Sequence, residues 1–344
     1  MMRYAGIFFC GVVFGVALSL IFKDLGVAPL QLYDEGTYAQ VVAESIARGD
    51  FLTFTYQDQL FFDKPPLYFW LAGIATVLTG DPVLGIRLPA ALAAIGVVAM
   101  VMVLAHHWSR NYLTAALAGG LLVAIPPFMV ASREARLDVL ITLFILLALY
   151  AVLTRRWFMW GAMVALAVMA KSAIALFAIL PALPYIRKKC FWQGSLVSLS
   201  LIAPWHFYEW IRHGNDFWWS YLGYHVLERY ATNVFYNPNL QTDYWARLNE
   251  QAPQVLGLCI LMTVVAFALW REFSTEERHA LLLPFGLGVC MIALFFSAQT
   301  RALSYLVPLY PMVALFVALS CSFAVQRLHD RLGYAVSKND SRTS

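Results

Sequence analysis

Apolar runs long enough to cross a lipid bilayer recur along almost the whole chain of 344 residues. A helix needs about 20 apolar residues to span the hydrocarbon layer, and here 61% of the residues are hydrophobic while only 13% are charged. Soluble domains of this size are not so apolar, so the sequence predicts an all-α polytopic membrane protein with about ten transmembrane helices. The expected spans are residues 4–22, 88–106, 112–131, 139–154, 157–170, 172–186, 190–211, 252–270, 279–298 and 302–326.

The two ends of the chain are interpreted separately. The first apolar run follows Arg3 and could be a secretion signal, but no A-x-A cleavage site follows it. A run of about 19 residues is also long enough to span, so we interpret it as an uncleaved helix. Residues 1–326 are therefore expected to form one transmembrane domain, and the polar residues 327–344 a disordered cytoplasmic tail.

The sequence "FFDKPPLYFW" at residues 61–70 leads into an apolar run that is shorter than the others. Residues 67–79 offer only 13 positions after two prolines, which suits an interfacial or re-entrant helix better than a span. The charges in the loops decide between these alternatives. If residues 67–79 do not span, one side of the membrane receives thirteen of the 24 lysines and arginines but only five of the 20 acids. The positive-inside rule favours this arrangement, because a span here would move the "RR" and "RKK" clusters outside.

This topology makes both termini cytoplasmic and gives the outer face a long first loop. That loop is predicted to hold two membrane-surface helices, at about residues 37–48 and 65–79. The interiors of the predicted spans carry no Asp, Glu, Lys or Arg, whereas ion-coupled transporters usually need an ionisable group near the midplane. Chemistry is therefore expected in the outer loops, residues 23–87, 132–138 and 212–251.

Two charged clusters lie in the first outer loop. Asp34 and Glu35 precede an amphipathic stretch, where they could simply cap a helix or where one could act as a general base. Asp63 and Lys64 precede the short apolar run. They could be a snorkelling lysine with its partner, or a lysine that binds a phosphate beside an acid that binds a metal.

The remaining candidates lie at helix ends and in the later outer loops. Arg136 and Asp138 belong to "REARLD", which could be a solvated turn, but Asp138 stands where its helix enters lipid, an expensive place for an idle carboxylate. The others could each be a turn residue, a structural hydrogen-bonding group or an interfacial anchor. They are Lys171, His225, Arg229, Arg301 and Tyr305.

Taken together, these side chains place acids and cations on one face of an apolar bundle. Cations beside a bilayer suit an anionic lipid headgroup, and a phosphate leaving group needs positive charge in the transition state. A hydroxyl acceptor needs a carboxylate base. The basic residues are scattered, which argues against a nucleic-acid partner. The sequence has no Walker A loop, G-x-G-x-x-G, H-E-x-x-H or D-x-D motif, and the missing D-x-D argues against a nucleotide-sugar donor bound through a metal.

The order of several motifs resembles that of a known enzyme group. The segments are "YDEGTYAQVVAESIARGDFLTF", "DKPPLYFWLAG", "GIRLPAALAA", "REARLDVLITLF", "MAKSAIALF" and "RALSYLVPLYP". They resemble the polytopic GT-C glycosyltransferases, in the bacterial branch related to protein O-mannosyltransferases and lipid A aminoarabinose transferases. The resemblance covers residues 30–315 and implies a polyprenyl-phosphate-linked sugar donor and inversion at the anomeric carbon.

The resemblance also implies roles for individual positions. Asp34 and Asp138 match the two catalytic acids, and Arg136 and Glu35 are expected to orient the acceptor. Asp63 and His225 resemble a pair that binds a divalent metal ion in some members; no other cofactor is expected. The expected donor-phosphate ligands are Lys64, Lys171, Arg229, Arg301 and Tyr305.

Three features depart from the family pattern. The residue after Lys171 is Ser172 instead of the usual Gly, and the last-helix motif begins with Arg301 instead of Lys. The third departure is in extent. This chain has about ten predicted spans, whereas larger relatives carry further helices and a soluble periplasmic domain that often helps to bind the acceptor.

The sequence thus predicts a multi-pass glycosyltransferase of the bacterial inner membrane, with its active site on the periplasmic face. Its acceptor would be a hydroxyl of lipid A, another glycan, a lipid or a protein. The alternatives are a lipid-carrier transporter, a non-catalytic lipid-phosphate-binding protein, or a relative that binds the donor without turnover.

Overall fold

The computed structural model describes residues 2–31, 34–232 and 253–343, together with the single positions 243, 246 and 250. It is almost entirely helical, which confirms the predicted fold class. The described elements are α1 (Met2–Phe22), α2 (Asp34–Arg48), β1 (Thr55–Tyr56), β2 (Gln59–Leu60), α3 (Leu67–Thr79), α4 (Pro82–Ser109), α5 (Tyr112–Val123), α6 (Pro126–Ser132), α7 (Leu137–Leu153), α8 (Trp157–Lys171), η1 (Ser172–Ala175), α9 (Leu176–Ile179), η2 (Leu180–Tyr185), α10 (Lys189–Trp218), η3 (Trp219–Glu228), α11 (Arg229–Ala231), α13 (Pro253–Ala268), α14 (Thr275–Ser297), η5 (Leu303–Leu306) and α15 (Leu309–Thr343).

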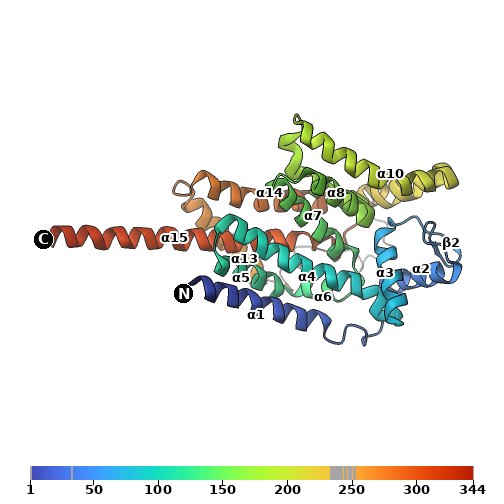
Figure 1. Ribbon diagram of the computed structural model, residues 1–344, viewed down its shortest axis with the longest axis horizontal. Helices are drawn as coiled ribbons and strands as arrows, with labels where there is room; N and C mark the ends of the chain where they lie inside the picture. The colour runs from blue at the N-terminus through green and yellow to red at the C-terminus, as the bar shows by residue number, and fades with distance from the viewer. Residues whose placement is uncertain are drawn as a thin grey trace.

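The long helices form an elongated bundle with two different ends. Both chain termini lie toward one end, and α2, α3 and the small β1–β2 hairpin lie at the other (Figure 1). The two strands pair antiparallel, with Thr55 opposite Leu60. The first loop therefore folds into a cap over one end of the bundle, and the two helices predicted for this loop are confirmed as α2 and α3.

Helix α3 packs with one face and leaves the other exposed. Tyr68, Phe69 and Ala72 are fully buried against the rest of the cap and α4, whereas Val77 and Leu78 are 66% and 80% exposed. The helix ends after 13 residues because Gly80 adopts the left-handed conformation, with φ of 66°, that closes a helix C-terminus. This short, half-buried helix fits the expected position at the membrane surface.

Among the residues that the structure describes, five helical segments are long and apolar enough to cross a membrane, or six if the bent pair α5–α6 is one span. One of the five, residues 157–185, is a hairpin in the structure. The rings of Trp157 and Tyr185 lie 5.0 Å apart, and Trp160 Nε1 donates to the Ala178 carbonyl at 3.0 Å. The chain therefore reverses near Lys171, as the sequence predicts from two short runs. The total of ten crossings stays a prediction.

The structure corrects the start of the second long span. Helix α4 begins at Pro82 instead of residue 88, because the Asp81 carboxylate accepts from the Val83 and Leu84 N–H groups and proline suits the first helical position. Arg87 therefore lies inside a helix, and the extent of the outer loop 23–87 stays a prediction.

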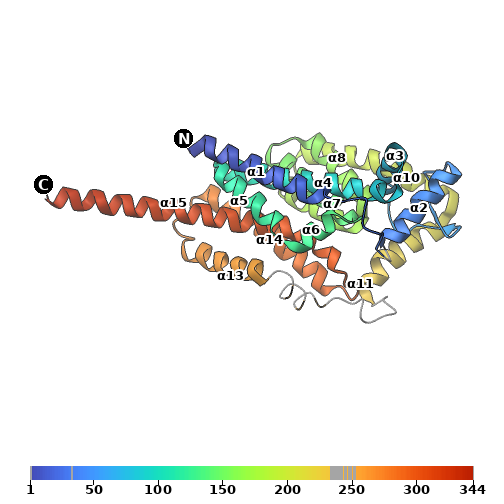
Figure 2. The same ribbon diagram turned by 90° about the horizontal axis from the view of Figure 1, so that it is seen from below.

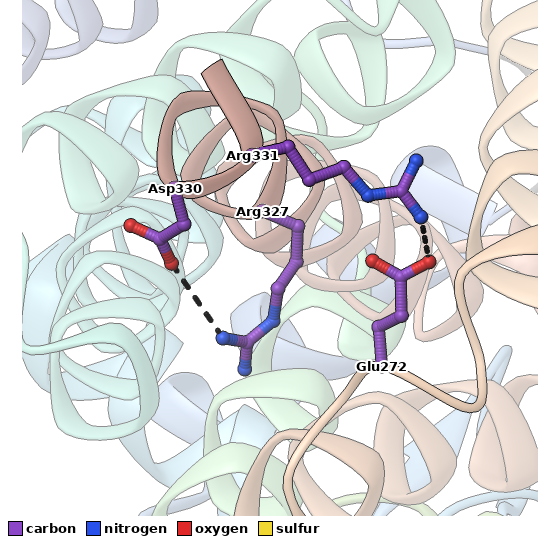
Figure 3. A pocket seen from close by; sticks show the side chains of 4 residues that line it. All are labelled: Glu272, Arg327, Asp330 and Arg331. Atoms are coloured by element: carbon purple, nitrogen blue, oxygen red, sulfur yellow. Dashed lines mark hydrogen bonds and ion pairs between the residues drawn. The ribbon is translucent and has the colours of Figure 1, made fainter. Parts of the chain in front are cut away.

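The predicted disordered tail is also corrected, because α15 continues as a helix through Thr343. Arg327 pairs with Glu277 and Arg331 with Glu272, so the turns beyond residue 326 are held against the α13–α14 connection. Figure 3 shows these arginines around a cavity of about 440 Å³ that Asp330 also lines. Arg327 is 18 residues beyond the start of α15, which is about 27 Å along the helix, so this cavity is far from the cap.

The predicted outer loop 212–251 is helical in its first half. Helix α10 continues to Trp218 with a kink at Gly214, where φ is 59°, and the π-helix η3 follows directly. Figure 2 shows α10 and α11 leading along the underside of the cap toward α14. The rest of this loop lies largely outside the described residues.

Candidate active site

Glu35 is the most deeply buried acid of the cap. Its carboxylate accepts from Arg87 Nε at 2.9 Å and from the second guanidinium nitrogen at 2.8 Å, and also from the backbone N–H groups of Gln31 and Ala135. Burial raises the pKa of Glu35, but the bonds from Arg87 and the two N–H groups outweigh it and hold the pKa below its usual value. Because Glu35 is 0% exposed and fully engaged, the expected contact with an acceptor is wrong.

Arg87 is a structural residue that the sequence interpretation missed. Besides Glu35, it donates to the carbonyls of Leu25, Ala28 and Pro29 at 2.8 to 3.0 Å. One guanidinium therefore joins the end of the segment after α1, the first turn of α2 and the start of α4. The sequence feature that could have identified it is an arginine in an otherwise apolar segment, "GIRLPAALAA", where an unpaired charge would be unfavourable. Its buried ion pair fixes the position of Asp34, the residue next to Glu35.

Asp34 differs from Glu35 because it faces the open side of the cap. Its side chain is 51% exposed, and its carboxylate accepts from Arg136 at 2.9 Å. Arg136 also donates to Glu134 at 2.8 Å, so it lies between two acids at the outer ends of α2 and α7. As the first residue of α2, Asp34 is also stabilised as a carboxylate by the helix dipole.

Asp138 forms the second acidic position, in the first turn of α7. Lys171 Nζ donates to its carboxylate at 2.6 Å, and the Asp138 side chain is only 5% exposed. The same ammonium lies 4.8 Å from the centre of the Tyr305 ring, which attracts it through the ring's negative face. The hairpin after α8 and the segment before α15 therefore meet at Asp138, and the structure brings together three residues that the sequence named separately.

Lys64 and Asp63 lie at the end of the cap that approaches α10 and η3. Asp63 accepts from His225 at 2.6 Å, and Lys64 donates to the Asp63 backbone carbonyl at 3.1 Å. Burial lowers the pKa of Lys64 to about 8; the charge of Asp63 opposes this shift, while Arg229 and Lys171 add to it. Three cations from distant segments thus share one region, and a bound anion would relieve their repulsion.

Arg229 is suited to bind such an anion. Its Nε is buried and finds no hydrogen-bond partner among the described residues. Its backbone carbonyl accepts from the Thr300 N–H at 3.1 Å, and Gln299 donates to the carbonyl of Tyr230 at 3.0 Å. Helix α11, which follows η3, is therefore attached to the segment between α14 and η5, and this fixes the backbone of Arg229.

Arg301 has a more structural environment than the sequence suggested. Its guanidinium donates to the carbonyls of Ala298 and Phe296, at 3.1 and 2.9 Å, at the end of α14. These contacts match the capping of a helix C-terminus by arginine. The predicted role of Arg301 in donor binding stays a prediction.

Asp63 and His225 provide two groups that could bind a divalent metal. Within the described part of the chain no cluster of three or more His, Cys, Asp or Glu side chains is placed to complete such a site. The charges of Lys64 and Arg229 also act on both groups and would repel a cation. The described residues therefore do not fit a resident metal by themselves, and no step proposed below uses one.

Comparison with known proteins shows what this chain is similar to. Residues 63–208 match the family model of dolichyl-phosphate-mannose-protein mannosyltransferases. The chain is 26% identical, over 320 residues, to an undecaprenyl phosphate-alpha-4-amino-4-deoxy-L-arabinose arabinosyl transferase from Pectobacterium carotovorum, and the match covers 87% of this chain. It superposes on the crystal structure of ArnT from Cupriavidus metallidurans bound to undecaprenyl phosphate with a TM-score of 0.69, at 22% identity and over 95% of this chain. The chain has the same GT-C fold as ArnT and is similar in sequence to the undecaprenyl phosphate-alpha-4-amino-4-deoxy-L-arabinose arabinosyl transferases.

A more distant GT-C protein shares the fold at lower similarity. The oligosaccharyltransferase AglB from Archaeoglobus fulgidus, solved with an inhibitory peptide and a dolichol-phosphate, matches 98% of this chain with a TM-score of 0.58 and 13% identity. The chain spans only 56% of the Pectobacterium relative and 63% of ArnT. These likenesses establish the fold, and the activity is argued below from the site.

Proposed function

We propose that this protein is a membrane glycosyltransferase that moves a sugar from a polyprenyl-phosphate donor to a hydroxyl of an envelope acceptor, with inversion. The observation that carries the proposal is the meeting of Asp34 and Asp138 with Lys64, Lys171 and Arg229 at one end of an apolar bundle. Acids and cations gathered there suit a reaction in which a hydroxyl loses a proton and a lipid phosphate leaves.

In the proposed reaction, Asp34 accepts the proton of the acceptor hydroxyl. The acceptor oxygen attacks the anomeric carbon as the bond between that carbon and the phosphate oxygen breaks, and the phosphate leaves with the bonding electrons. Lys64 and Arg229 stabilise the negative charge that develops on the phosphate, so no general acid is needed. Asp138, held by Lys171, faces the positive charge that develops at the sugar ring.

The relatives support this proposal through their described substrates. The Pectobacterium protein is an arabinosyl transferase named for an undecaprenyl phosphate-linked sugar, and ArnT was solved with undecaprenyl phosphate. We propose the same class of donor here. The acceptor is proposed only as a hydroxyl on the outer face, because the matched relatives extend well beyond this chain.

The direct test uses purified protein in detergent with an undecaprenyl-phosphate-linked sugar that carries a radiolabel, and a lipid extract of the cell envelope as acceptor. Transfer of label, with release of undecaprenyl phosphate, supports the proposal. Movement of the lipid across reconstituted membranes without any transferred sugar would instead favour a transporter.

Donor binding is expected to weaken as the pH rises above about 8. Burial lowers the pKa of Lys64 to about 8, so the ammonium loses its proton there and with it the attraction to the phosphate. The donor KM should increase through this range, and a Lys64→Arg variant should extend binding to higher pH because arginine stays charged. The measurement is the KM for the donor from pH 7 to 9.5. An identical pH profile in both proteins would exclude Lys64 as the group responsible.

We further propose that the cap lies on the periplasmic face of the inner membrane, with both termini in the cytoplasm. The structure places the termini at the end opposite the cap, as this topology requires (Figure 1). A periplasm-specific reporter inserted in the α3–α4 turn, near residue 81, should be active, and one fused after residue 344 inactive. The reverse pattern would contradict the proposed topology.

A further inference from the structure

Arg136 lies between two carboxylates that reach it from different parts of the chain. Its Nη1 group donates to Asp34 at 2.9 Å, and its Nε donates to Glu134 at 2.8 Å. Asp34 begins α2, whereas Glu134 lies two positions before Arg136, in the loop between α6 and α7. The proposed reaction uses Asp34 as the base and gives Glu134 no part. One guanidinium carries a single positive charge, so the two acids share it.

The loop that carries Glu134 and Arg136 is fixed to the start of α2. The Arg136 N–H donates to the Glu134 carbonyl at 2.7 Å, which closes a tight turn. Between them, the N–H of the fully buried Ala135 donates to the carboxylate of Glu35 at 2.7 Å. Glu35 is the neighbour of Asp34, so one buried carboxylate sets the positions of both the base and the loop that faces it.

Glu134 is the less exposed of the two acids that share Arg136. Its side chain is 13% exposed, whereas that of Asp34 is 51% exposed, so water screens the attraction of Arg136 to Asp34 more than its attraction to Glu134. Burial opposes the charge of Arg136, but the carboxylates of Asp34 and Glu134 outweigh it and raise the pKa of the guanidinium. The positive charge beside Asp34 is therefore permanent, and Glu134 is placed to offset it.

A permanent positive charge beside a general base works against catalysis. A cation stabilises the carboxylate relative to its protonated form, so it makes that carboxylate a weaker proton acceptor. A base that binds protons too weakly contributes less to the removal of a hydroxyl proton. A second carboxylate on the same guanidinium reduces the positive field at Asp34, while the contact with Arg136 still orients the Asp34 side chain.

We propose that Glu134 is a positioning residue for Asp34: it holds Arg136 through Nε and offsets its charge, so that Asp34 is oriented by the guanidinium and still accepts the proton of the acceptor hydroxyl. This inference rests on the proposed function. The proton moves from the hydroxyl to Asp34, and Glu134 and Arg136 keep their charges throughout.

The test compares Glu134→Gln with the wild type in the sugar-transfer assay over a range of pH. The amide oxygen can still accept from Arg136 Nε, so the change removes the charge and keeps the contact. Asp34 then faces a cation that nothing offsets. The acidic limb of the kcat profile should move about 0.5 to 1 unit to lower pH, and kcat on the plateau should fall about threefold. The donor KM should stay within about twofold.

Two further variants separate the charge of Glu134 from its shape. Arg136→Gln removes the cation and leaves the Glu134 charge, so the acidic limb should move to higher pH, opposite to its movement in Glu134→Gln. Glu134→Asp keeps the charge, so the limb should stay at its wild-type position even where the shorter side chain lowers kcat. Glu276→Gln is the matched control, because it removes the same charge from an exposed side chain in the first turn of α14, next to Glu277, which pairs with Arg327 far from the cap.

Other charged or titratable groups also interact with Asp34 and Arg136. Lys64 approaches Asp34 from the segment before α3, and Tyr38 lies one turn further along α2. Asp138 acts on Arg136 from the first turn of α7. These groups are unchanged in every variant of the comparison, so a difference in the acidic limb reports the charges of Glu134 and Arg136.

A second measurement follows Asp34 without turnover. The infrared difference between a protein and the same protein with Asp34→Asn, recorded at a series of pH values, isolates the carboxylate band of Asp34. With Glu134→Gln this band should persist to lower pH than with Glu134 in place, and Glu276→Gln should not move it.

Each measurement has an outcome that would overturn the inference. One is an Asp34 band, or an acidic limb, that lies at the same pH with and without the Glu134 charge. Another is a loss of about a thousandfold in kcat for Glu134→Gln with no movement of the limb, which would make Glu134 the base itself. A wild-type protein that transfers no sugar would refute the proposed function instead, and the infrared series alone would then decide whether Glu134 offsets Arg136.

Discussion

Replacing Asp34 by Asn is expected to lower kcat for sugar transfer by about a thousandfold, within the range of general-base catalysis. The amide keeps the shape of the side chain and can still contact Arg136, but it cannot accept the proton of the acceptor hydroxyl. The donor KM should change little, because the proposed phosphate ligands are Lys64 and Arg229. Initial rates at saturating donor, with thermal unfolding of the same preparation, measure the effect.

Asp58→Asn provides the matched control for this variant. Asp58 lies in the turn between β1 and β2 of the same cap, with φ of 61°, a conformation that asparagine tolerates well. This change should leave kcat unaltered. Retention of full activity in Asp34→Asn would exclude the residue as the base, and Glu134 or Asp138 would then be the acids to consider.

Replacing Arg87 by Met is expected to reduce the free energy of unfolding by about 3 to 5 kcal/mol, the range for a buried ion pair that loses one partner. The change leaves the Glu35 carboxylate buried with only two backbone donors, and it also removes the bonds to three carbonyls. The cap should loosen with it, so activity should fall as well. Thermal unfolding in detergent, followed by intrinsic fluorescence, gives the shift in midpoint.

Two further variants test the cause of this loss. Arg48→Met breaks a surface ion pair with Asp50, in which the arginine side chain is 38% exposed, and should alter stability by about 1 kcal/mol or less. Combining Arg87→Met with Glu35→Leu removes the stranded carboxylate and should recover part of the stability. An Arg87→Met protein no less stable than Arg48→Met would show that the buried pair does not hold the cap.

The overall architecture could be predicted from composition and charge because a membrane imposes strong rules. Apolar length identifies spanning segments, and the sidedness of the "RR" and "RKK" loops argued that residues 67–79 do not cross. The structure shows these residues as the short, half-exposed helix α3. The boundaries were harder to predict, since the Asp81 cap and Pro82 extend α4 by local chemistry that hydropathy does not register.

The sequence predicted which residues belong to the candidate site, but it did not show how each side chain is placed there. Asp34 and Glu35 are neighbours with similar side chains, and nothing in their order shows that one faces the open side while the other is buried against Arg87. The hydropathy pattern likewise gave no sign that Glu209 is a structural residue. It is fully buried within α10, and its carboxylate accepts from the Thr53 hydroxyl at 2.9 Å. A sequence does not show that Glu209 is buried, because the burial depends on its hydrogen bond with Thr53, which lies 156 positions away in the chain.

The sequence by itself determined that this chain is a helical membrane protein, and it predicted that the acids and cations of the candidate site lie on one side of the membrane. These results follow because charged residues are excluded from the spans and the bias of lysine and arginine between the loops sets the orientation. Only the tertiary structure decided which charges are paired: Glu35 with Arg87, Asp138 with Lys171, Asp63 with His225, and Asp34 with Arg136 at the open side of the cap. These pairs join segments that are distant in the chain, and ion pairing depends on separations of a few ångströms that no local pattern specifies.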